Sequence, residues 1–456
     1  MDCYSGTRAQ LQASKYWLHG FFLDLCSRKQ LVPDPSGNHV DQHSVATTTT
    51  TKDLTSLPRL NQLLERMKTQ ATPKMMVLHA PVGVRSIVSF LVAFFVVASS
   101  IVFLFDRGQE AQVQMAVEHG RQEECNWSRG QWVYDNVSRP LYSGLKCTFI
   151  FPEVACDKYG RKDVMYQHWR WQPHGCDLPR FDAIKLLEML RNKRLVFVGD
   201  SVNRNQWVSL VCMVEASIPD DRLKTRIFNG SLISFKALEY NATIDFYWSP
   251  LLLESNSDNP IIHRVDYRMI RADRIEKHAS VLRDADIIVF NSYLWWRKQN
   301  DDMRMKVMYG SFEDGDARLD EMEMMDGFEI ALKKLTEWLG ENIDKKKTRI
   351  FFAGSSPTHF WASKWGGEDS NNLMAMAKSY FQTLLEPKGI HVEILNITEL
   401  SDYRKDGHPT VFRKQYVPLM KEQIAKPASY ADCTHWCLPG VPDVWNEFLY
   451  SYLMYR

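Results

Sequence analysis

Short apolar runs alternate with longer amphipathic stretches over the C-terminal part of the chain. Four runs rich in β-branched and aromatic residues are typical of buried parallel strands: Arg194–Gly199, Asp286–Asn291, Arg349–Ala353 and His391–Asn396. Apolar residues at three- and four-residue spacing predict helices over Phe181–Arg191, Val202–Glu215, Ala272–Leu282, Leu319–Leu339 and Pro442–Tyr455. We interpret the Met-rich stretch Met303–Met325 as a loop that runs into a core-packing helix. The alternation predicts an α/β fold.

One apolar run is of a different kind. Ser86–Phe105 holds twenty residues without a charge, and at about 1.5 Å per residue this length spans the roughly 30 Å hydrocarbon layer of a membrane. Basic residues precede the run and acidic residues are frequent after it, which predicts a cytosolic N-terminus and a luminal C-terminal part. We interpret the run as an uncleaved signal anchor; a buried helix of a soluble domain is the alternative.

The apolar run and the residues on either side of it divide the chain into four parts. We expect a mostly disordered cytosolic tail over 1–85, the transmembrane anchor over 86–105, a luminal stem over 106–120 and a luminal domain over 121–456. Within that domain, 121–180 is a loop-rich segment with many Cys and Trp, and 181–456 carries the α/β pattern. Met75 or Met76 is an alternative start of the chain.

Two further features agree with a luminal location. Glycosylation sequons occur only after the apolar run, at Asn126, Asn136, Asn229, Asn241 and Asn396. Seven of the nine cysteines also follow it, where disulfides persist. Zinc binding is the rival explanation for these cysteines, but the chain has no paired CxxC and the spacings are irregular, so we expect no metal.

The composition narrows the classes of function. With 45% hydrophobic and 24% charged residues, the chain is not a long disordered protein. A formal net charge of +1 gives no electrostatic basis for nucleic-acid binding. The aromatic content of 12%, with 14 Trp, suits a large core or a surface that stacks on sugar rings.

The first predicted strand ends in Gly199-Asp200-Ser201, directly before a helix. Active sites of open α/β sheets lie at such carboxyl strand ends. Gly199 permits a tight turn, and backbone N–H groups at the helix start can stabilise an oxyanion on a substrate attacked by Ser201. The same three residues are also an ordinary helix N-cap, and alone they do not decide between the two interpretations.

Near the C-terminus, Asp432 and His435 stand three residues apart. This spacing can bring the carboxylate to the imidazole, so that the other ring nitrogen can take a proton from Ser201. The order of Ser followed by Asp-x-x-His occurs in an esterase architecture. Asn291, at the end of its strand, fits an amide donor to the oxyanion, or else a turn-forming residue.

Three other residues are candidates for contacts with substrate. Arg204 follows Ser201 by three residues and can bind an anionic donor, orient a loop or form a structural ion pair. Trp295 and Trp296 follow the strand that ends at Asn291. They are a sugar-stacking platform if exposed and part of the core if buried.

Several stretches together resemble the plant trichome-birefringence-like family of polysaccharide O-acetyltransferases, of PC-esterase type. They are CNWSRGQWVYD, HWRWQPHGCDLPRFD, LVFVGDSVNRNQW, DIIVFNSYLWW, FFAGSSPTHF and DCTHWCLPGVPDVWNEFLY, and the similarity covers about 121–456. The resemblance implies a three-layer α/β/α sandwich of the Gly-Asp-Ser-Leu (SGNH) esterase type. The SYLWW version of the fourth stretch looks most like members acting on xylan.

The resemblance implies a two-step acetyl transfer. Ser201 would be the nucleophile, His435 the general base and Asp432 its orienting partner. An acetyl group would pass from a donor to Ser201 and then to a xylosyl hydroxyl of xylan. No bound cofactor is implied, and the donor stays open between acetyl-CoA and an acetylated intermediate. A Golgi membrane protein of single-pass type II topology is the expected setting.

The resemblance also implies three disulfides: Cys125–Cys176, Cys147–Cys212 and Cys156–Cys437. Family members usually carry a further Cys where this chain has Leu373-Met374-Ala375-Met376. We therefore expect Cys433 to lack a partner, with a looser Asp432–His435 loop and lower activity.

Two other functions remain open from the sequence. A carbohydrate acetylesterase uses the same triad when water wins the second step. A non-catalytic protein that binds wall polysaccharide can retain the same fold.

Overall fold

A computed structural model of the chain describes residues 125–298, 302–313, 317–359 and 368–455. The expected cytosolic tail, the transmembrane anchor over 86–105 and the stem lie outside these residues. Across the described ranges, no helix combines the length and the apolar character needed to span a bilayer.

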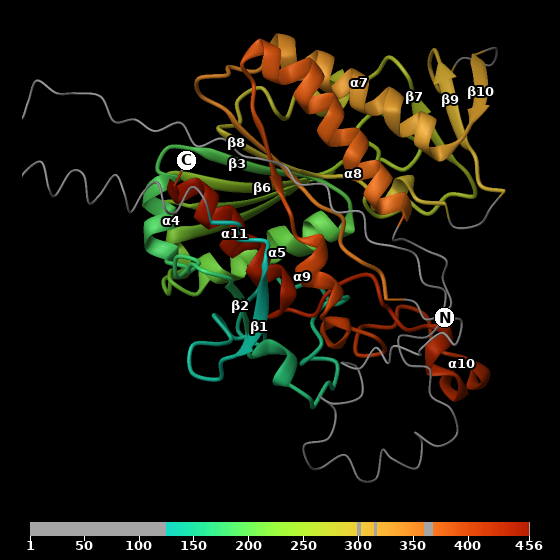
Figure 1. The fold of residues 1–456 in the computed structure, drawn as a ribbon. Coiled ribbons are helices and arrows are strands. Elements are labelled where there is room, and N and C mark those ends of the chain that lie inside the picture. Colours follow the sequence, from blue (N-terminus) through green and yellow to red (C-terminus); the bar gives the residue numbers. More distant parts are fainter. Residues whose placement is uncertain (1–124, 299–301, 314–316, 360–367, 456) are drawn as a thin grey trace, which may run out of the picture. The chain divides into compact units, whose positions relative to one another are not determined.

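A seven-stranded sheet organises the described part of the chain (Figure 1). Its strands, in spatial order, are β12 (Val392–Leu395), β11 (Arg349–Ala353), β8 (Ile287–Asn291), β3 (Arg194–Gly199), β6 (Ala242–Trp248), β5 (Leu232–Ala237) and β4 (Lys224–Asn229). The first five run parallel, and β5 and β4 join antiparallel. The chain therefore has an α/β fold with β3 at the centre of the sheet.

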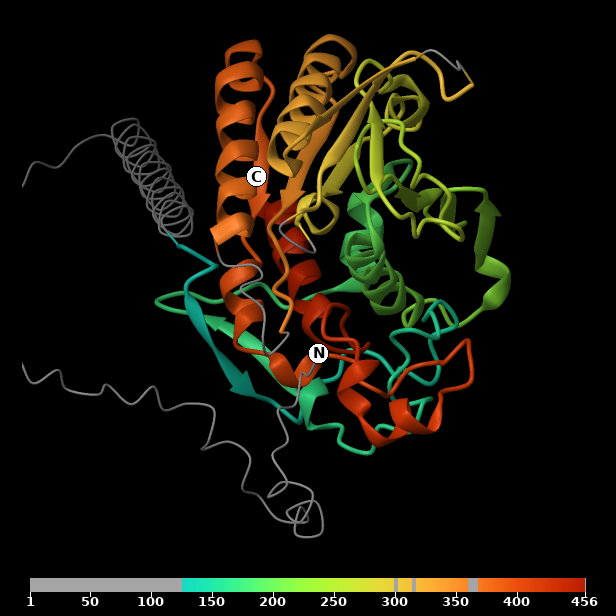
Figure 2. The ribbon, with the colours of Figure 1, turned by 90° about the vertical axis from the view of Figure 1, so that its right-hand side faces the viewer.

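Helices cover both faces of the sheet, as Figures 1 and 2 show. One face packs against α4 (Ala183–Met189), α5 (Ser201–Glu215) and α11 (Val441–Tyr455), and the other against α7 (Met324–Asn342) and α8 (Glu368–Tyr380). The side chains of β3 alternate between the two cores, with Leu195 and Phe197 in one and Val196 and Val198 in the other. Because both faces are buried, this strand reads as a continuous apolar run.

A second, three-stranded sheet lies in the order β10 (Arg318–Met322), β9 (Met305–Tyr309) and β7 (Arg268–Arg271). The expected helix over Leu319–Leu339 is therefore wrong at its start, since β10 pairs with β9 before α7 begins. The Met-rich stretch is likewise a pair of strands rather than a loop. Its Met305 and Met324 are nevertheless buried in the core, as the packing interpretation requires.

The remaining elements are short. The expected helix over Ala272–Leu282 is reduced to α6 (Glu276–Ala279). Elsewhere the chain forms α9 (Thr398–Asp402), α10 (Lys421–Ala425) and an antiparallel pair, β1 (Gly130–Tyr134) with β2 (Trp169–Pro173). Of the expected strands, those at β3 and β11 have the predicted bounds, and β8 and β12 are shorter by one and two residues.

Two disulfides hold the N-terminal segment to the sheet domain, and a third lies within that segment. The structure contains Cys125–Cys176, Cys147–Cys212 and Cys156–Cys437, the three pairs that the resemblance implies. The expectation of an unpaired Cys433 is wrong, because this residue is also disulfide-bonded. The expectations of a looser Asp432–His435 loop and of lower activity depended on an unpaired Cys433, and they fall with it. Leu373, at the position of the missing family cysteine, is a residue of α8 whose side chain is buried in the core.

Candidate active site

Ser201 is the first residue of α5 and follows the central strand β3 after a single intervening residue, Asp200. Asp200 caps the helix, since its Oδ1 accepts a hydrogen bond of 2.8 Å from the Val202 amide. The N-cap interpretation of this sequence is therefore correct for Asp200. It does not compete with a role for Ser201, whose side chain is half-buried at the carboxyl end of the strand.

His435 joins Ser201 to Asp432 through both nitrogens of its ring. His435 Nε2 lies 2.7 Å from Ser201 Oγ, and His435 Nδ1 lies 2.8 Å from Asp432 Oδ2. The second oxygen, Asp432 Oδ1, accepts from the backbone amides of Thr434 and His435, each at 3.0 Å. The carboxylate thus fixes both the ring and the main chain that carries it. Residues 234 positions apart in the sequence form one line of hydrogen bonds.

The electrostatics of this line suit a proton acceptor. Burial opposes charge on both partners, but the attraction and hydrogen bonds between them outweigh it. The pKa of Asp432 is held well below its usual range, and the pKa of His435 is raised above the ordinary 6.5. Asp432 is therefore ionised at neutral pH, and a proton arriving on His435 is stabilised.

Asn291 does not point an amide donor at the serine. It is 1% exposed, and its Nδ2 donates to the backbone oxygens of Ala353 and Gly354 at 3.3 and 3.1 Å. Both amide hydrogens are thereby used, so the prediction of Asn291 as an oxyanion donor is wrong. The side chain ties the carboxyl ends of β8 and β11 together. By contrast, the Ser201 backbone N–H has no recorded acceptor within the described residues.

Gly199 has a packing role. A Cβ added at this position would stand 2.1 Å from the backbone oxygen of Asn291 and 3.0 Å from Asn203 Cβ. Only glycine lets β3 and β8 approach so closely at the point where the chain turns into α5. We find no direct contact of Gly199 with the reacting groups, and its effect on Ser201 passes through the backbone.

Arg204 lies beside the serine with its charge unpaired. Its guanidinium stacks on the Phe151 ring at 4.6 Å and has no ion pair or hydrogen bond within the described part of the chain. Burial lowers the pKa of this guanidinium, while the neighbouring Glu153 and Tyr416 favour its charge. The structural ion pair that the sequence left open is therefore absent among the described residues.

The two tryptophans differ in burial. Trp296 is 2% exposed, packs against Phe328 and donates from Nε1 to Ser292 Oγ at 2.9 Å. Its proposed sugar-stacking role is wrong, since the ring belongs to the core. Trp295 is only partly buried and keeps the stacking interpretation.

Around Trp295 stand residues that the sequence did not single out. The Trp248 and His263 rings lie 6.1 and 5.8 Å from it, and the Arg268 guanidinium lies 5.1 Å from its centre. Burial lowers the pKa of Arg268 to about 10, and the charge of Asp200 partly offsets this. They could not be identified from the sequence, because Trp248 and Arg268 lie far from Ser201 along the chain and on two different strands.

The five sequon asparagines are all exposed: Asn126, Asn136, Asn229, Asn241 and Asn396. Each is therefore accessible for a glycan. Across the described ranges, no group of three or more His, Cys, Asp or Glu side chains is arranged to hold a metal ion.

Comparisons with known proteins agree with this geometry. Residues 178–452 match the PC-Esterase family, a GDSL/SGNH-like acyl-esterase family found in Pmr5 and Cas1p, and residues 123–177 match the PMR5 N-terminal domain. The chain belongs to the PC-esterase family.

Curated relatives make the similarity more specific. The chain is 64% identical to Xylan O-acetyltransferase 13 of Oryza sativa subsp. japonica, over 85% of this chain and 92% of the relative. It is 65% identical to Xylan O-acetyltransferase 12 of the same organism, with the same coverage. It is 50% identical to Protein trichome birefringence-like 34 of Arabidopsis thaliana, over 73% of this chain and 85% of the relative.

Proposed function

We propose that the protein is a xylan O-acetyltransferase that moves an acetyl group through a Ser201 acyl-enzyme to xylosyl hydroxyls of the xylan backbone. The observation that carries the chemistry is the hydrogen-bonded line from Ser201 through His435 to Asp432, at 2.7 and 2.8 Å. The names of the two relatives above 60% identity support xylan as the acceptor.

In the first half of the reaction, Ser201 Oγ attacks the acetyl carbonyl and His435 Nε2 takes the hydroxyl proton. Asp432 stabilises the imidazolium that forms. The tetrahedral intermediate then collapses, the bond to the donor breaks, and His435 returns the proton to the departing donor. Ser201 is left as an acetyl ester.

In the second half, a xylosyl hydroxyl gives its proton to His435 and its oxygen attacks the acetyl carbonyl. The bond to Ser201 Oγ breaks, and His435 returns the proton to the serine. The oxyanion of both intermediates needs a donor, and the Ser201 backbone N–H at the start of α5 is the group in place for it. Transfer rather than hydrolysis requires that the sugar hydroxyl outcompete water, which depends on how the acceptor is positioned.

Arg204 suits the donor side of the site. An unpaired guanidinium in a partly buried position gains most from an anionic group. We assign it to binding an anionic part of the acetyl donor, either acetyl-CoA or an acetylated intermediate. Trp295, with its partly exposed ring, is assigned to stacking on the acceptor sugar. Nucleic acid has no place in this proposal.

The proposal extends to the setting of the enzyme. The catalytic part is assigned to the three-layer SGNH sandwich type and to the Golgi lumen, held by the anchor over 86–105 in a single-pass type II topology. The exposed sequons support a luminal location. Mapping occupied glycosylation sites by mass spectrometry on protein from plant microsomes tests it, since a cytosolic domain would carry none.

The function is tested with the full-length protein in detergent, beside Ser201→Ala. Both are incubated with deacetylated xylo-oligosaccharides and 4-nitrophenyl acetate, and the oligosaccharide mass and free acetate are followed. Acetylated sugar from the wild type alone supports the proposal. Acetate release without acetylated sugar would identify an esterase, and xylan binding without turnover would identify a non-catalytic binding protein.

A further inference from the structure

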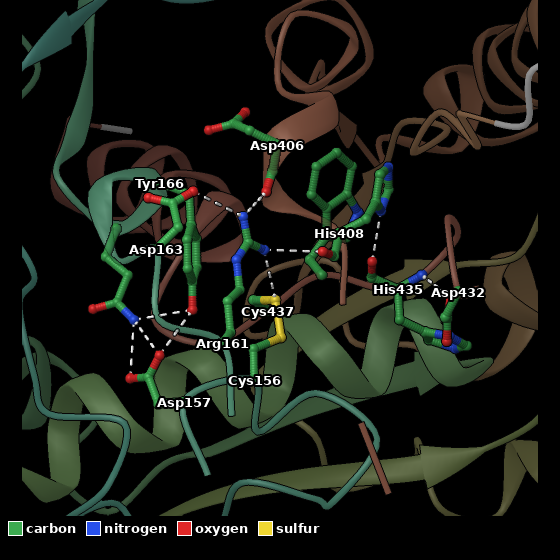
Figure 3. The surroundings of a disulfide bond; sticks show 12 residues. Cys156, Asp157, Arg161, Asp163, Tyr166, Asp406, His408, Asp432, His435 and Cys437 are labelled. Atoms are coloured by element: carbon green, nitrogen blue, oxygen red, sulfur yellow. Dashed lines mark hydrogen bonds and ion pairs between the residues drawn. A yellow bond between two sulfur atoms is a disulfide. The ribbon is translucent and has the colours of Figure 1, made fainter. Parts of the chain in front are cut away.

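Two histidines outside the line described above contact the loop that carries it. His408 is fully buried, and its Nδ1 lies 2.6 Å from the backbone oxygen of His435 (Figure 3). His359 Nδ1 in turn lies 2.6 Å from His408 Nε2. The His359 backbone N–H donates to the backbone oxygen of Cys433 at 3.1 Å. Hydrogen bonds from His359 and His408 therefore hold the carbonyl groups of Cys433 and His435, on either side of Thr434.

The partners determine which ring nitrogen carries hydrogen. The His435 carbonyl oxygen can only accept, so the hydrogen of this contact belongs to His408 Nδ1. Burial lowers the pKa of His408 to about 3, so the ring is neutral at physiological pH and its Nε2 has a free lone pair. His359 Nδ1 faces that lone pair, and His359 Nε2 lies 3.1 Å from the backbone oxygen of Asp402. The His435 carbonyl and the burial of the ring thus set the tautomer in which His408 holds the loop.

His408 itself is held rigidly. Its ring stacks on the Trp436 ring at 4.1 Å between centroids. Its backbone oxygen accepts from Arg161 Nη1 at 3.0 Å, and the same nitrogen contacts Cys437 Sγ at 3.3 Å (Figure 3). The backbone of His408 is thereby tied through Arg161 to the Cys156–Cys437 disulfide.

The other anchors of the loop lie at its ends. Asp432 forms a two-way backbone bridge with Thr410, with both hydrogen bonds at 2.9 Å, and the Trp436 amide donates to Asn205 Oδ1 at 2.8 Å. Neither of these hydrogen bonds involves the carbonyl group of the peptide between His435 and Trp436. The His408 N–H supplies that contact, so it controls the tilt of the peptide that bears the His435 ring.

We propose that His408 is a positioning residue for acetyl transfer: it fixes the backbone carbonyl of His435 so that the ring stays aligned between Ser201 and Asp432. The inference rests on the proposed function of Ser201 and His435. A shift of about 1 Å in a catalytic group costs on the order of 10²-fold in rate. Losing the His408 donor therefore lowers kcat, while acceptor binding, which does not use His408, is unchanged.

The test compares two amide variants of similar polarity. In His408→Asn, the side-chain Nδ2 takes the place of the ring Nδ1 and can still donate to the His435 carbonyl. In His408→Gln, the amide reaches the place of Nε2 and cannot. His278→Asn is the control for loss of a buried imidazole, because His278 is 3% exposed and contacts Tyr247 and Asp258 instead of the loop.

For each full-length variant, kcat and KM for the xylo-oligosaccharide, the melting temperature and the rate of serine labelling by a fluorophosphonate are measured. We expect His408→Gln to lose about 10²-fold in kcat and in labelling rate with KM within twofold, and His408→Asn to recover at least tenfold of both. His278→Asn should lower the melting temperature and leave kcat within twofold.

The proposal would be overturned if His408→Asn and His408→Gln had equal kcat. It would also be overturned if kcat fell in proportion to the melting temperature in these two variants and in His278→Asn. Ser201→Ala in the same series distinguishes a failure of the proposed function from a failure of the positioning role of His408. If that variant still transfers acetyl groups, the proposed function fails. If it is inactive while His408→Gln behaves as wild type, only the positioning role fails.

Discussion

Replacing Asp432 by Asn tests the central line of hydrogen bonds with little change in shape. The amide keeps an oxygen for the Thr434 and His435 amides, which donate to Asp432 Oδ1 at 3.0 Å. It turns an NH₂ group toward His435 Nδ1, where the carboxylate accepts at 2.8 Å. The ring then carries its hydrogen on Nε2, facing Ser201, and cannot take the serine proton.

The size of the effect follows from the lost charge. At the 2.8 Å separation of His435 Nδ1 and Asp432 Oδ2, Coulomb's law with an effective dielectric constant near 20 gives about 6 kcal/mol. This is the stabilisation that Asp432 gives to the imidazolium formed as the serine attacks. Since about 1.4 kcal/mol corresponds to tenfold in rate, we expect kcat to fall by about 10⁴-fold.

The pH profile gives a second readout of the same change. His435 must be neutral to accept a proton, and its pKa is raised because Asp432 outweighs the effect of burial. The acid limb of kcat/KM in the wild type should therefore lie above the ordinary 6.5. In Asp432→Asn the attraction is lost and burial remains, so the residual activity should have its acid limb at lower pH.

Steady-state transfer to xylo-oligosaccharide between pH 5 and 9 measures both effects. Asp443→Asn is the control, because Asp443 is a buried carboxyl that bonds to Tyr142 and Ser209 away from this line. It should change stability and leave kcat near that of the wild type. A folded Asp432→Asn variant with less than a tenfold loss in kcat, or with an unshifted acid limb, would refute the reasoning.

Three further changes have expected outcomes. Gly199→Ala places a Cβ 2.1 Å from the backbone of the neighbouring strand, so we expect about 1–3 kcal/mol of destabilisation in chemical denaturation and a fall in kcat; an unchanged kcat would contradict the role of this contact in placing the nucleophile. Cys437→Ser opens a link between residues 281 apart, and loop closure predicts a loss of up to about 5 kcal/mol, which differential scanning calorimetry measures against Cys156→Ser as a matched variant that must behave alike. Trp295→Ala should raise KM for the acceptor with little change in melting temperature, whereas Trp296→Ala should cost about 3–5 kcal/mol of stability; the reverse pattern would exchange their roles.

The sequence by itself determined four of the parallel strands of the large sheet, β3, β8, β11 and β12. Arg194–Gly199 and Arg349–Ala353 have their predicted bounds because strands buried on both faces need continuous apolar runs. Other strands were not predicted from the sequence, among them β6 beside the central β3. Arg318–Met322 is a polar segment. It is extended because it pairs with Met305–Tyr309, and this pairing cannot be read from the helical spacing of its apolar residues.

The candidate site divides in the same way. Ser201, Asp432 and His435 were found from the sequence, because a turn after a strand and a three-residue spacing are local features with direct chemical meaning. Burial and the direction of a side chain are not local. Asn291 donates to the next strand instead of toward the serine, and Trp296 enters the core while its neighbour stays partly exposed.

His408 shows what only the tertiary structure decides. Nothing near it in the sequence marks it, since it stands 27 residues before His435 in a segment without a regular pattern. Its role follows from a carbonyl oxygen, a second imidazole and a disulfide that the fold brings to it from distant positions. The sequence identifies the groups that can react, whereas the tertiary structure determines which groups hold them in place, because alignment depends on hydrogen bonds between residues far apart in the chain.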